Sequence, residues 1–351
     1  QAEERSGEGI DRSIALTAGG MSRLASALLA LATVAAVAVA VRPTVDVTAT
    51  VAFGEGYTPL FGFDNILRSA DDRTVSLLLD RSTGSGFISS AMYEHGFFSA
   101  SIKLPSDYTA GVVVAFYTSN GDVFPKTHDE LDFEFLGNIR GKPWRMQTNM
   151  YGNGSVSRGR EERYVLPFDP TTEFHRYSIL WARDAVVFYV DDVPVRDLRR
   201  ARAGRDFPAK PMALYATVWD ASNWATSGGR YRVNYQYGPF VASFTDLALA
   251  GCRTGDGASS PTEEGCADAL AASDPAVMTL AKQQAMRQFR ERNMVYSYCY
   301  DTRRYPVPFP ECDLVESERT RFKDSGHRLS LRRRRVGHRP ARPGAANKAD
   351  M

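Results

Sequence analysis

Short runs of aliphatic, β-branched and aromatic residues follow one another from about residue 45 to residue 250. Turn-forming sequences separate them, including Ser119-Asn120-Gly121-Asp122, Asp191-Asp192 and Gly228-Gly229. Many short strands with regular turns are typical of an all-β sandwich. We expect strands at 75–79, 97–104, 111–117, 130–136, 144–151, 175–181, 185–190 and 212–219. The pattern predicts two stacked antiparallel sheets, one of them curved into a cleft.

Acidic and apolar residues alternate in residues 127–137, where Glu130, Asp132 and Glu134 interleave with Leu131, Phe133 and Phe135. On a strand this period of two places the carboxylates on one face, with His128 in the same row, and the apolar side chains on the other. Neighbouring carboxylates repel one another, and strands disfavour Asp and Glu. The carboxylate row, Glu130, Asp132 and Glu134, therefore indicates a catalytic surface. A solvated acidic edge strand is the alternative.

Two neighbouring carboxyl groups are what glycoside hydrolysis with retention requires, one as nucleophile and one as proton donor. We assign Glu130 as nucleophile, Glu134 as general acid/base, and Asp132 as a residue that tunes the charge of Glu130. Like-charge proximity keeps one member of the pair protonated near neutral pH. Residues i and i+4 of a strand lie about 13 Å apart at Cα, so both glutamates must lean inward.

The sequence from His128 to Gly137 resembles the active-site signature of plant xyloglucan endotransglucosylase/hydrolases, in glycoside hydrolase family sixteen. The resemblance runs from about Phe53 to Cys312. It implies a concanavalin-like β-jelly roll that cleaves the β-1,4-glucan backbone of xyloglucan with retention and transfers the glycosyl unit to another xyloglucan chain, without a cofactor. A mainly hydrolytic enzyme and a non-catalytic lectin-like module are the alternatives, and the carboxylate row argues against the second.

The amides of Gln147 and Asn149 share one strand face and can hydrogen-bond sugar hydroxyls. The resemblance implies a wider set of substrate contacts: Glu134, Gln147, Thr148, Asn149, Gly159, Arg160, Glu161, Trp219, Trp224, Ala225, Gly229 and Arg304. For several of these residues a purely structural role is the alternative. Arg160 and Glu161 fit a surface ion-paired strand, a strand-end tryptophan is often a core residue, and Arg304 fits an ion pair that holds down the C-terminal segment.

The composition changes at Gly251, and all four cysteines of the chain follow. Apolar residues near helical spacing within residues 276–294 indicate an amphipathic helix. Neighbour order and the family pattern pair Cys252 with Cys266 and Cys299 with Cys312, in a small C-terminal extension over 251–315. No histidine accompanies the cysteines at zinc-ligand spacing, so we expect no metal site.

Residues 21–41 have the pattern of a secretory signal peptide, with Arg23 before the apolar run Ala27 to Val41. A signal anchor is the alternative. The polar residues 1–20 resemble a leader or an extension ahead of the true start. We therefore expect a protein secreted to the cell wall, with no membrane contact after cleavage, and a catalytic domain over 42–250. Asn153-Gly154-Ser155 is a sequon for N-glycosylation.

The formal net charge of the 351-residue chain is +2, so the overall charge identifies no partner and gives no reason to expect nucleic acid. Residues 316–351 are basic, with four consecutive arginines at 332–335. Such a segment is usually a solvated, disordered tail. Weak contact with acidic wall polysaccharide is the functional alternative for it.

Overall fold

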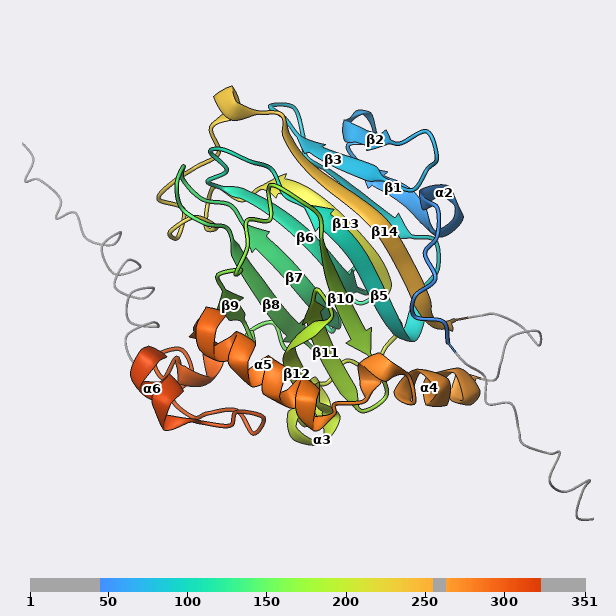
Figure 1. The fold of residues 1–351 in the computed structure, drawn as a ribbon, viewed down its shortest axis with the longest axis vertical. Helices are drawn as coiled ribbons and strands as arrows, with labels where there is room; N and C mark the ends of the chain where they lie inside the picture. Colours follow the sequence, from blue (N-terminus) through green and yellow to red (C-terminus); the bar gives the residue numbers. More distant parts are fainter. Residues whose placement is uncertain (1–44, 255–262, 323–351) are drawn as a thin grey trace, which may run out of the picture. The chain divides into compact units, whose positions relative to one another are not determined.

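The computed structural model describes residues 45–254 and 263–322. It contains two antiparallel sheets (Figure 1). The eight-stranded sheet has the order β1 (Tyr57–Phe61), β4 (Ser85–Ser89), β13 (Ala213–Asp220), β6 (Val112–Ser119), β7 (Glu130–Leu136), β8 (Arg145–Tyr151), β9 (Glu162–Tyr164) and β15 (Met294–Ser297). The seven-stranded sheet has the order β12 (Val193–Arg199), β11 (Ala185–Val190), β10 (His175–Trp181), β5 (Tyr93–Lys103), β14 (Phe240–Arg253), β3 (Val75–Leu79) and β2 (Ile66–Arg68).

This arrangement confirms the expected all-β jelly-roll sandwich. The expected bounds of β3, β7, β10 and β11 agree with the structure, and the other expected strands begin and end within four residues of the observed ones. The agreement has a local cause, because β-branched and aromatic residues favour extended backbone while Gly, Asn and Asp mark the turns.

The central strand β7 is seated by its apolar face. Phe133 packs edge-to-face on Tyr177 and Phe188 of the opposite sheet, with ring centroids 5.7 and 5.2 Å apart. Leu131 and Phe135 are fully buried beside it. Burying a side chain of this size contributes about 1.5–3 kcal/mol. Because side chains alternate along the strand, this burial fixes the carboxylate row on the opposite face of the sheet.

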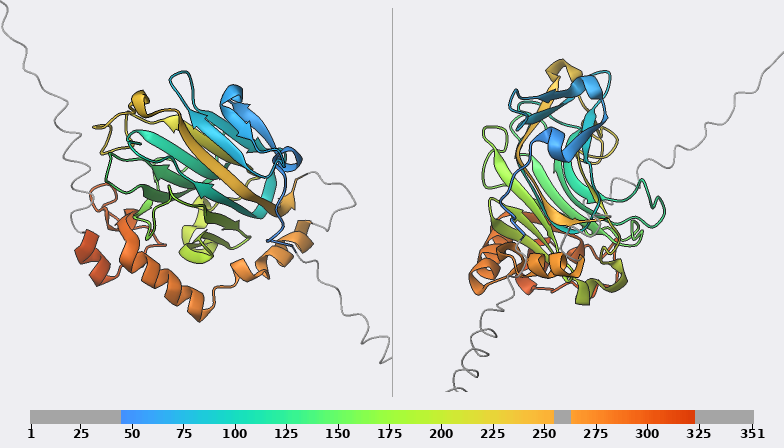
Figure 2. Two further views of the ribbon diagram at one scale, coloured as in Figure 1. Left: turned by 45° about the horizontal axis from the view of Figure 1, so that its top comes forward. Right: turned by 90° about the vertical axis from the view of Figure 1, so that its right-hand side faces the viewer.

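The C-terminal extension is built into the sandwich. Strand β15 pairs with β9 and forms one edge of the eight-stranded sheet. Three helices, α4 (Glu263–Ala271), α5 (Leu280–Asn293) and α6 (Glu316–Phe322), lie along the same end of the sandwich in every view (Figures 1 and 2). The expected helix within 276–294 corresponds to α5, which begins after Thr279 because its hydroxyl accepts a hydrogen bond from the Lys282 amide. Two shorter helices are α2 (Phe53–Gly56) and α3 (Arg200–Ala203).

Helix α4 includes Cys266. One expectation for this region needs correction. The expected disordered tail from residue 316 begins instead with α6, whose Phe322 is buried against the Tyr300 ring at 5.5 Å. This apolar contact orders a segment that charge alone would leave solvated. The leader, the signal peptide and the tail beyond residue 322 lie outside the described residues.

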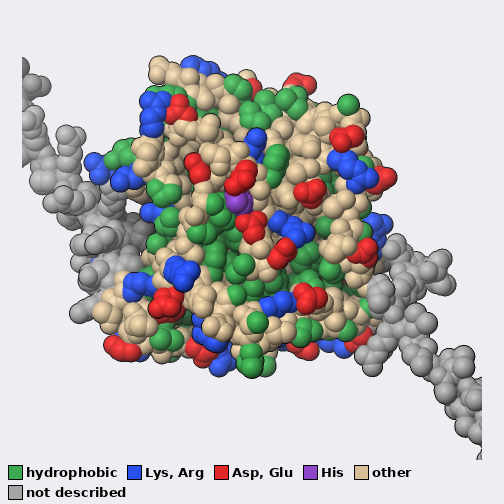
Figure 3. All heavy atoms as spheres, viewed as in Figure 1, with side chains coloured by type: hydrophobic (Ala, Val, Ile, Leu, Met, Phe, Trp, Pro, Cys, Tyr) green, Lys and Arg blue, Asp and Glu red, His purple; other side chains and the backbone are tan. Residues whose placement is uncertain are grey.

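The face in Figure 3 carries Lys and Arg side chains interspersed with Asp and Glu. It therefore presents no extended field of one sign to a charged partner. Within residues 45–254 and 263–322, no helix combines the length and apolar character needed to cross a membrane.

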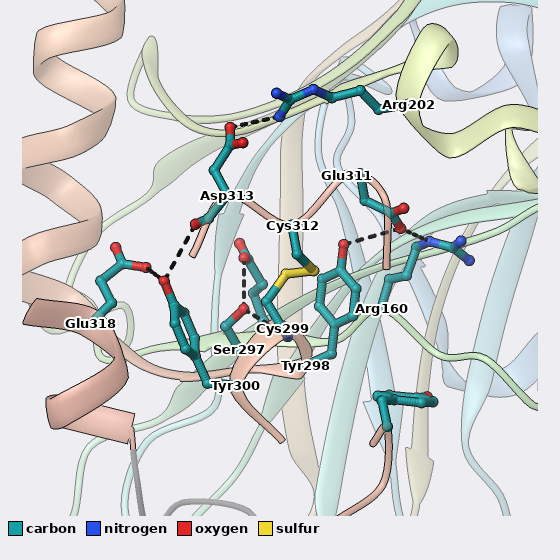
Figure 4. The surroundings of a disulfide bond; sticks show 12 residues. Arg160, Arg202, Ser297, Tyr298, Cys299, Tyr300, Glu311, Cys312, Asp313 and Glu318 are labelled. Carbon is teal, nitrogen blue, oxygen red and sulfur yellow. Dashed lines mark hydrogen bonds and ion pairs between the residues drawn. A yellow bond between two sulfur atoms is a disulfide. The ribbon is translucent and has the colours of Figure 1, made fainter. Parts of the chain in front are cut away.

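Both expected disulfides are present, Cys252–Cys266 and Cys299–Cys312. The first joins β14 to α4. The second lies among Arg160, Tyr298 and Glu311, where the Tyr298 hydroxyl donates to Glu311 Oε1 at 3.2 Å (Figure 4). The second bridge therefore fastens the segment that carries Glu311 to the one that carries Tyr298.

We expect the native protein to contain no free thiol, because all four cysteines are paired. The bridges span sequence separations of 14 and 13 residues, and each should stabilise the fold by about 2–4 kcal/mol. Thiol titration of denatured, unreduced protein measures the pairing, and chemical denaturation of Cys299→Ser/Cys312→Ser measures the energy. One free thiol per chain in the wild type would contradict the prediction.

Candidate active site

The three carboxylates converge on one pocket. Strand β7 lies between β6 and β8, and the register places Glu130 beside Ser119, Asp132 beside Asn149 and Glu134 beside Gln147. The pocket has a volume of about 350 Å³ and is lined by Phe61, Ala115, Tyr117, Glu130, Asp132, Glu134, Thr217 and Trp219. Acidic oxygens therefore face aromatic and small side chains across a space that accepts a sugar ring.

Amides from the neighbouring strand hold two of the acids, and donors on the next segment orient those amides. Gln147 donates from Nε2 to Glu134 Oε2, while its Oε1 accepts from Arg163 Nε at 2.7 Å. Because the guanidinium occupies the amide oxygen, the amide NH₂ group must face Glu134. This pair of bonds fixes the position of the Glu134 carboxyl group.

Asn149 is oriented in the same way. Its Oδ1 accepts from the backbone N–H of Arg160 at 2.8 Å, and its Nδ2 donates to Asp132 Oδ2 at 3.2 Å. The other oxygen of Asp132, Oδ1, is buried and has no hydrogen-bond partner among the described residues. A direct hydrogen bond to Glu130 is one way in which Asp132 could tune its charge, but the bond that the structure gives Asp132 comes from Asn149.

Burial changes the protonation of the whole row. Burial, reinforced by the charge of Glu130 and opposed by Arg163, raises the pKa of Glu134 to about 7. Burial also raises the pKa of Glu130 to about 7, against a hydrogen bond from Ser119. Burial first, and then both glutamates, raise the pKa of Asp132 well above its usual range. The row therefore holds protons near neutral pH, so a neutral acid and a carboxylate can coexist in one pocket.

We expect Glu134→Gln to stabilise the protein at pH 8 and to have little effect at pH 4. The pKa of Glu134 rises from 4.5 to about 7 on folding, so the folded state binds more protons and the free energy of unfolding falls as pH rises between these values. A shift of this size corresponds to roughly 3 kcal/mol, and a glutamine can still accept the bond from Gln147. Urea unfolding at both pH values measures the difference.

Glu173→Gln is the matched control, because it makes the same change of side chain and charge at an exposed position. An equal change in stability at pH 4 and pH 8 for Glu134→Gln would contradict the expected linkage.

Trp219 and Trp224 were expected in the cleft. Trp219, at the end of β13, lines the carboxylate pocket. Trp224 follows in a turn with 41% of its surface exposed, so its ring is available for a sugar face. Gly229 closes this turn with φ +79°, and a Cβ there would approach the Asn223 carbonyl oxygen to 2.3 Å. Gly229 therefore shapes the turn that presents Trp224. Ala225 of the same turn lines a separate pocket near Leu136.

Two residues expected to contact substrate do not reach the cleft. Thr148 is fully buried on the core face of β8, where its hydroxyl accepts from Arg196 Nη1 at 3.0 Å. Its neighbours Gln147 and Asn149 take the cleft face, as strand alternation requires. Arg160 is 1% exposed and its guanidinium is ion-paired with Asp206 at 2.9 Å and Glu311 at 2.5 Å. Its backbone N–H, not its side chain, serves the site.

Arg304 and Glu161 form an ion pair, with Arg304 Nη1 at 2.6 Å from Glu161 Oε2. Gly159 makes room for it, because a Cβ there would lie 2.5 Å from Glu161 Oε1 and 2.7 Å from Arg304 Nη2. The ion pair holds the extension to the sandwich, as the structural alternative for Arg304 requires. The Arg304 side chain is still 38% exposed, which leaves it able to contact a polymer.

The sequence interpretation missed Arg163 and Tyr117. Arg163 orients Gln147, and Tyr117 lines the pocket in register with Asp132. Alternation on β6 could have placed Tyr117 on the cleft face, but nothing local distinguishes Arg163 from Arg160. Among the described residues, no group of three His, Cys, Asp or Glu side chains is arranged to hold a metal ion.

Two family models match the chain. Residues 53–237 match glycosyl hydrolases family 16, and residues 266–312 match the xyloglucan endo-transglycosylase (XET) C-terminus. A solved prokaryotic beta-1,3-1,4-glucanase (lichenase) from a mouse hindgut metagenome aligns with 58% of this chain and 98% of its own, at 21% identity and a TM-score of 0.46.

Two curated relatives from Arabidopsis thaliana are far more similar. The protein named "Probable xyloglucan endotransglucosylase/hydrolase protein 30" is 62% identical over 79% of this chain and 81% of its own length. The one named "Probable xyloglucan endotransglucosylase/hydrolase protein 29" is 59% identical over 78% of this chain and 80% of its own. With the carboxylate row in one pocket and both family models matched, the chain belongs to the xyloglucan endotransglucosylase/hydrolases of glycosyl hydrolase family 16.

Proposed function

We propose that this protein is a secreted endo-acting transglucosylase that cleaves the β-1,4-glucan backbone of xyloglucan with retention and joins the new end to another xyloglucan chain. The observation that carries the proposal is the convergence of Glu130, Asp132 and Glu134 on one pocket with raised pKa values. A sugar-binding module needs no acid and carboxylate pair. A secreted protein also accords with two disulfides, which persist in oxidising compartments.

In the first step Glu130 attacks the anomeric carbon and forms an ester, while Glu134 protonates the departing glycosidic oxygen. Ester formation removes the charge of Glu130. The pKa of Glu134 then falls, because that charge was one cause of its elevation. In the second step Glu134 takes the proton of an acceptor hydroxyl, whose oxygen attacks the anomeric carbon. The ester bond breaks and its electron pair returns to the Glu130 carboxylate.

Asp132 acts through its neighbours in this scheme. It is buried between the two glutamates and held by Asn149. The protonation state of Asp132 changes the electrostatic potential at both glutamates. We therefore expect Asp132→Asn to lower turnover by a smaller factor than a change at Glu130 or Glu134 would.

The sugar-binding surface proposed here combines Glu134 of the row and its neighbours Gln147 and Asn149 with Trp219 at the end of β13 and Trp224 in the turn that follows. Arg163 replaces Arg160 in this set, because the side chain of Arg160 is buried. Glu161 and Arg304 extend the surface toward the extension. Aromatic faces and polar side chains on both sides of the row suit a polymer that crosses the site.

We expect transfer to outrun hydrolysis. An acceptor held on this surface has a high effective concentration and is oriented for attack, which bulk water is not. The measurement pairs two assays on one preparation: release of reducing ends from xyloglucan, and incorporation of a labelled xyloglucan oligosaccharide. Transfer conserves reducing ends whereas hydrolysis creates them. If reducing ends appear without acceptor as fast as label is incorporated with it, the enzyme is mainly a hydrolase.

The sequon at Asn153 is proposed as a glycosylation site. Asn153 is exposed in a left-handed turn with φ +51°, and its backbone N–H donates to Asp129 Oδ1 at 2.5 Å. The amide side chain is therefore presented outward by a fixed backbone. Contact between the basic tail and acidic wall polysaccharide also stays a prediction, because that tail lies beyond the described residues.

A further inference from the structure

A second pocket lies beside the carboxylate row, on the side of Glu134. It has a volume of about 340 Å³, and its charged lining residues are Arg145 and Arg163, with no acidic residue among those that line it. Arg145 lies on β8 opposite Leu136, and Arg163 lies on β9 opposite Gln147. Because Gln147 bonds Glu134, this Arg145–Arg163 pocket adjoins the acid/base residue.

Arg145 has no counter-ion among the described residues. It occupies the cleft face of β8 with Gln147 and Asn149, since the alternate residue Met146 is in the core. Its Nη1 is buried and lacks a hydrogen-bond partner in the part of the chain that the structure describes. Burial lowers the pKa of the guanidinium. An unsatisfied buried donor is costly, so this group is suited to a partner that the described residues do not supply.

Arg163 adds a second positive charge to the same pocket. Its Nε is engaged by Gln147, and its guanidinium lies over the Tyr296 ring at 5.2 Å. The Tyr296 hydroxyl donates to Asp301 at 3.0 Å, which holds the ring in place. Arg163 forms no ion pair with any residue in the described ranges. Two guanidinium groups without a carboxylate make a cationic pocket, and a planar carboxylate is the group they bind best.

We propose that the Arg145–Arg163 pocket is an acceptor subsite for a sugar carboxylate, so that the enzyme transfers preferentially to acceptor chains that carry a uronic acid residue. This inference rests on the proposed function. Glu134 exchanges its proton with the departing and incoming chains, so the acceptor occupies its side of the site. None of the three acids of the row lines this pocket, so the acceptor carboxylate would not contact them directly.

The test uses the full chain, xyloglucan as donor and a matched pair of labelled acceptors. One acceptor is a neutral xyloglucan oligosaccharide, and the other is the same oligosaccharide with primary hydroxyl groups oxidised to carboxylates. For the wild type we expect kcat/KM for the oxidised acceptor to exceed that for the neutral one by about tenfold, as charge-assisted hydrogen bonds in a partly buried pocket imply. Raising the salt concentration should shrink this ratio.

The variants test the assignment through the same ratio, which does not depend on how much active enzyme a preparation contains. Arg145→Gln should bring the ratio to about one or below, and Arg145→Lys should restore part of it, because lysine keeps the charge without the planar fork. Arg176→Gln is the control, since Arg176 is exposed on β10 of the other sheet and pairs with Asp192. It should leave the ratio unchanged.

A wild-type ratio of one or less, or a preference that survives Arg145→Gln, would overturn the subsite while leaving the proposed function intact, since the neutral acceptor is still used. No transfer to either acceptor would overturn the proposed function and, with it, the assignment of this pocket to an acceptor.

Discussion

Glu130→Ala and Glu134→Gln should each reduce turnover of polymeric xyloglucan by a factor on the order of 10⁴ or more, with folding retained. Alanine at 130 has no carboxylate, so the ester with the anomeric carbon cannot form. Glutamine at 134 keeps the bond from Gln147 but carries no transferable proton. Both variants also remove an ionisable group from a row whose members raise one another's pKa, so neither should unfold the protein.

Two measurements separate chemistry from folding. Circular dichroism and thermal unfolding report the fold, and label incorporation reports transfer. A small anionic nucleophile such as azide should restore bond cleavage in Glu130→Ala, because it enters the space left by the carboxylate and attacks the anomeric carbon. Thr171→Ala, in an exposed turn of the sandwich, controls for effects of preparing a variant protein. Near-wild-type activity in either glutamate variant would remove the basis for the assigned roles.

Glu162→Gln should destabilise the protein by about 3–5 kcal/mol, because it leaves buried arginines without their counter-ion. Glu162 is 3% exposed and accepts hydrogen bonds from Arg290 Nη1 at 2.5 Å and Nη2 at 2.9 Å. Arg196 Nε lies 3.6 Å from Glu162 Oε2. Tyr164 and Ser297 also donate to it. Since Arg290 belongs to α5, this cluster joins the extension to β9 of the catalytic sheet.

The pH dependence gives the prediction a second readout. Burial alone would raise the pKa of Glu162, but Arg290 and Arg196 hold it at about 2. Its contribution is therefore present above the unfolded pKa of 4.5 and is lost as pH falls through about 2. Urea unfolding at pH 7 and pH 3 should show that the difference in free energy of unfolding between wild type and Glu162→Gln is smaller at the lower pH.

A double variant tests the physical reason. Glu162→Leu/Arg290→Leu removes both members of the closest pair, so its cost should be less than the sum of the two single variants. Additive costs would mean that Glu162 and Arg290 do not depend on each other, and the cluster would not be what fastens the extension.

The sequence by itself located eight of the fifteen strands in the described residues, and it determined which way β7 faces. The reason is local, because a period of two on extended backbone assigns Leu131 and Phe133 to one face and Glu130 and Asp132 to the other without any knowledge of the partner strands. The disulfide pairing also followed from the sequence, since neighbour order and the family pattern agreed and the two segments close short loops.

The tertiary structure alone decided the roles of the arginines. Arg160, Arg163, Arg145 and Arg196 have the same side chain but different surroundings. Arg160 is ion-paired with acids 46 and 151 positions away in the sequence, and Arg163 orients an amide. Arg145 faces a pocket and has no counter-ion among the described residues, and Arg196 is buried beside Glu162. The burial of a charge depends on which distant groups surround it. For the same reason, the sequence did not show that α6 packs on the extension, which follows from the contact of Phe322 with Tyr300 and from the hydrogen bond that the Tyr300 hydroxyl donates to Glu318.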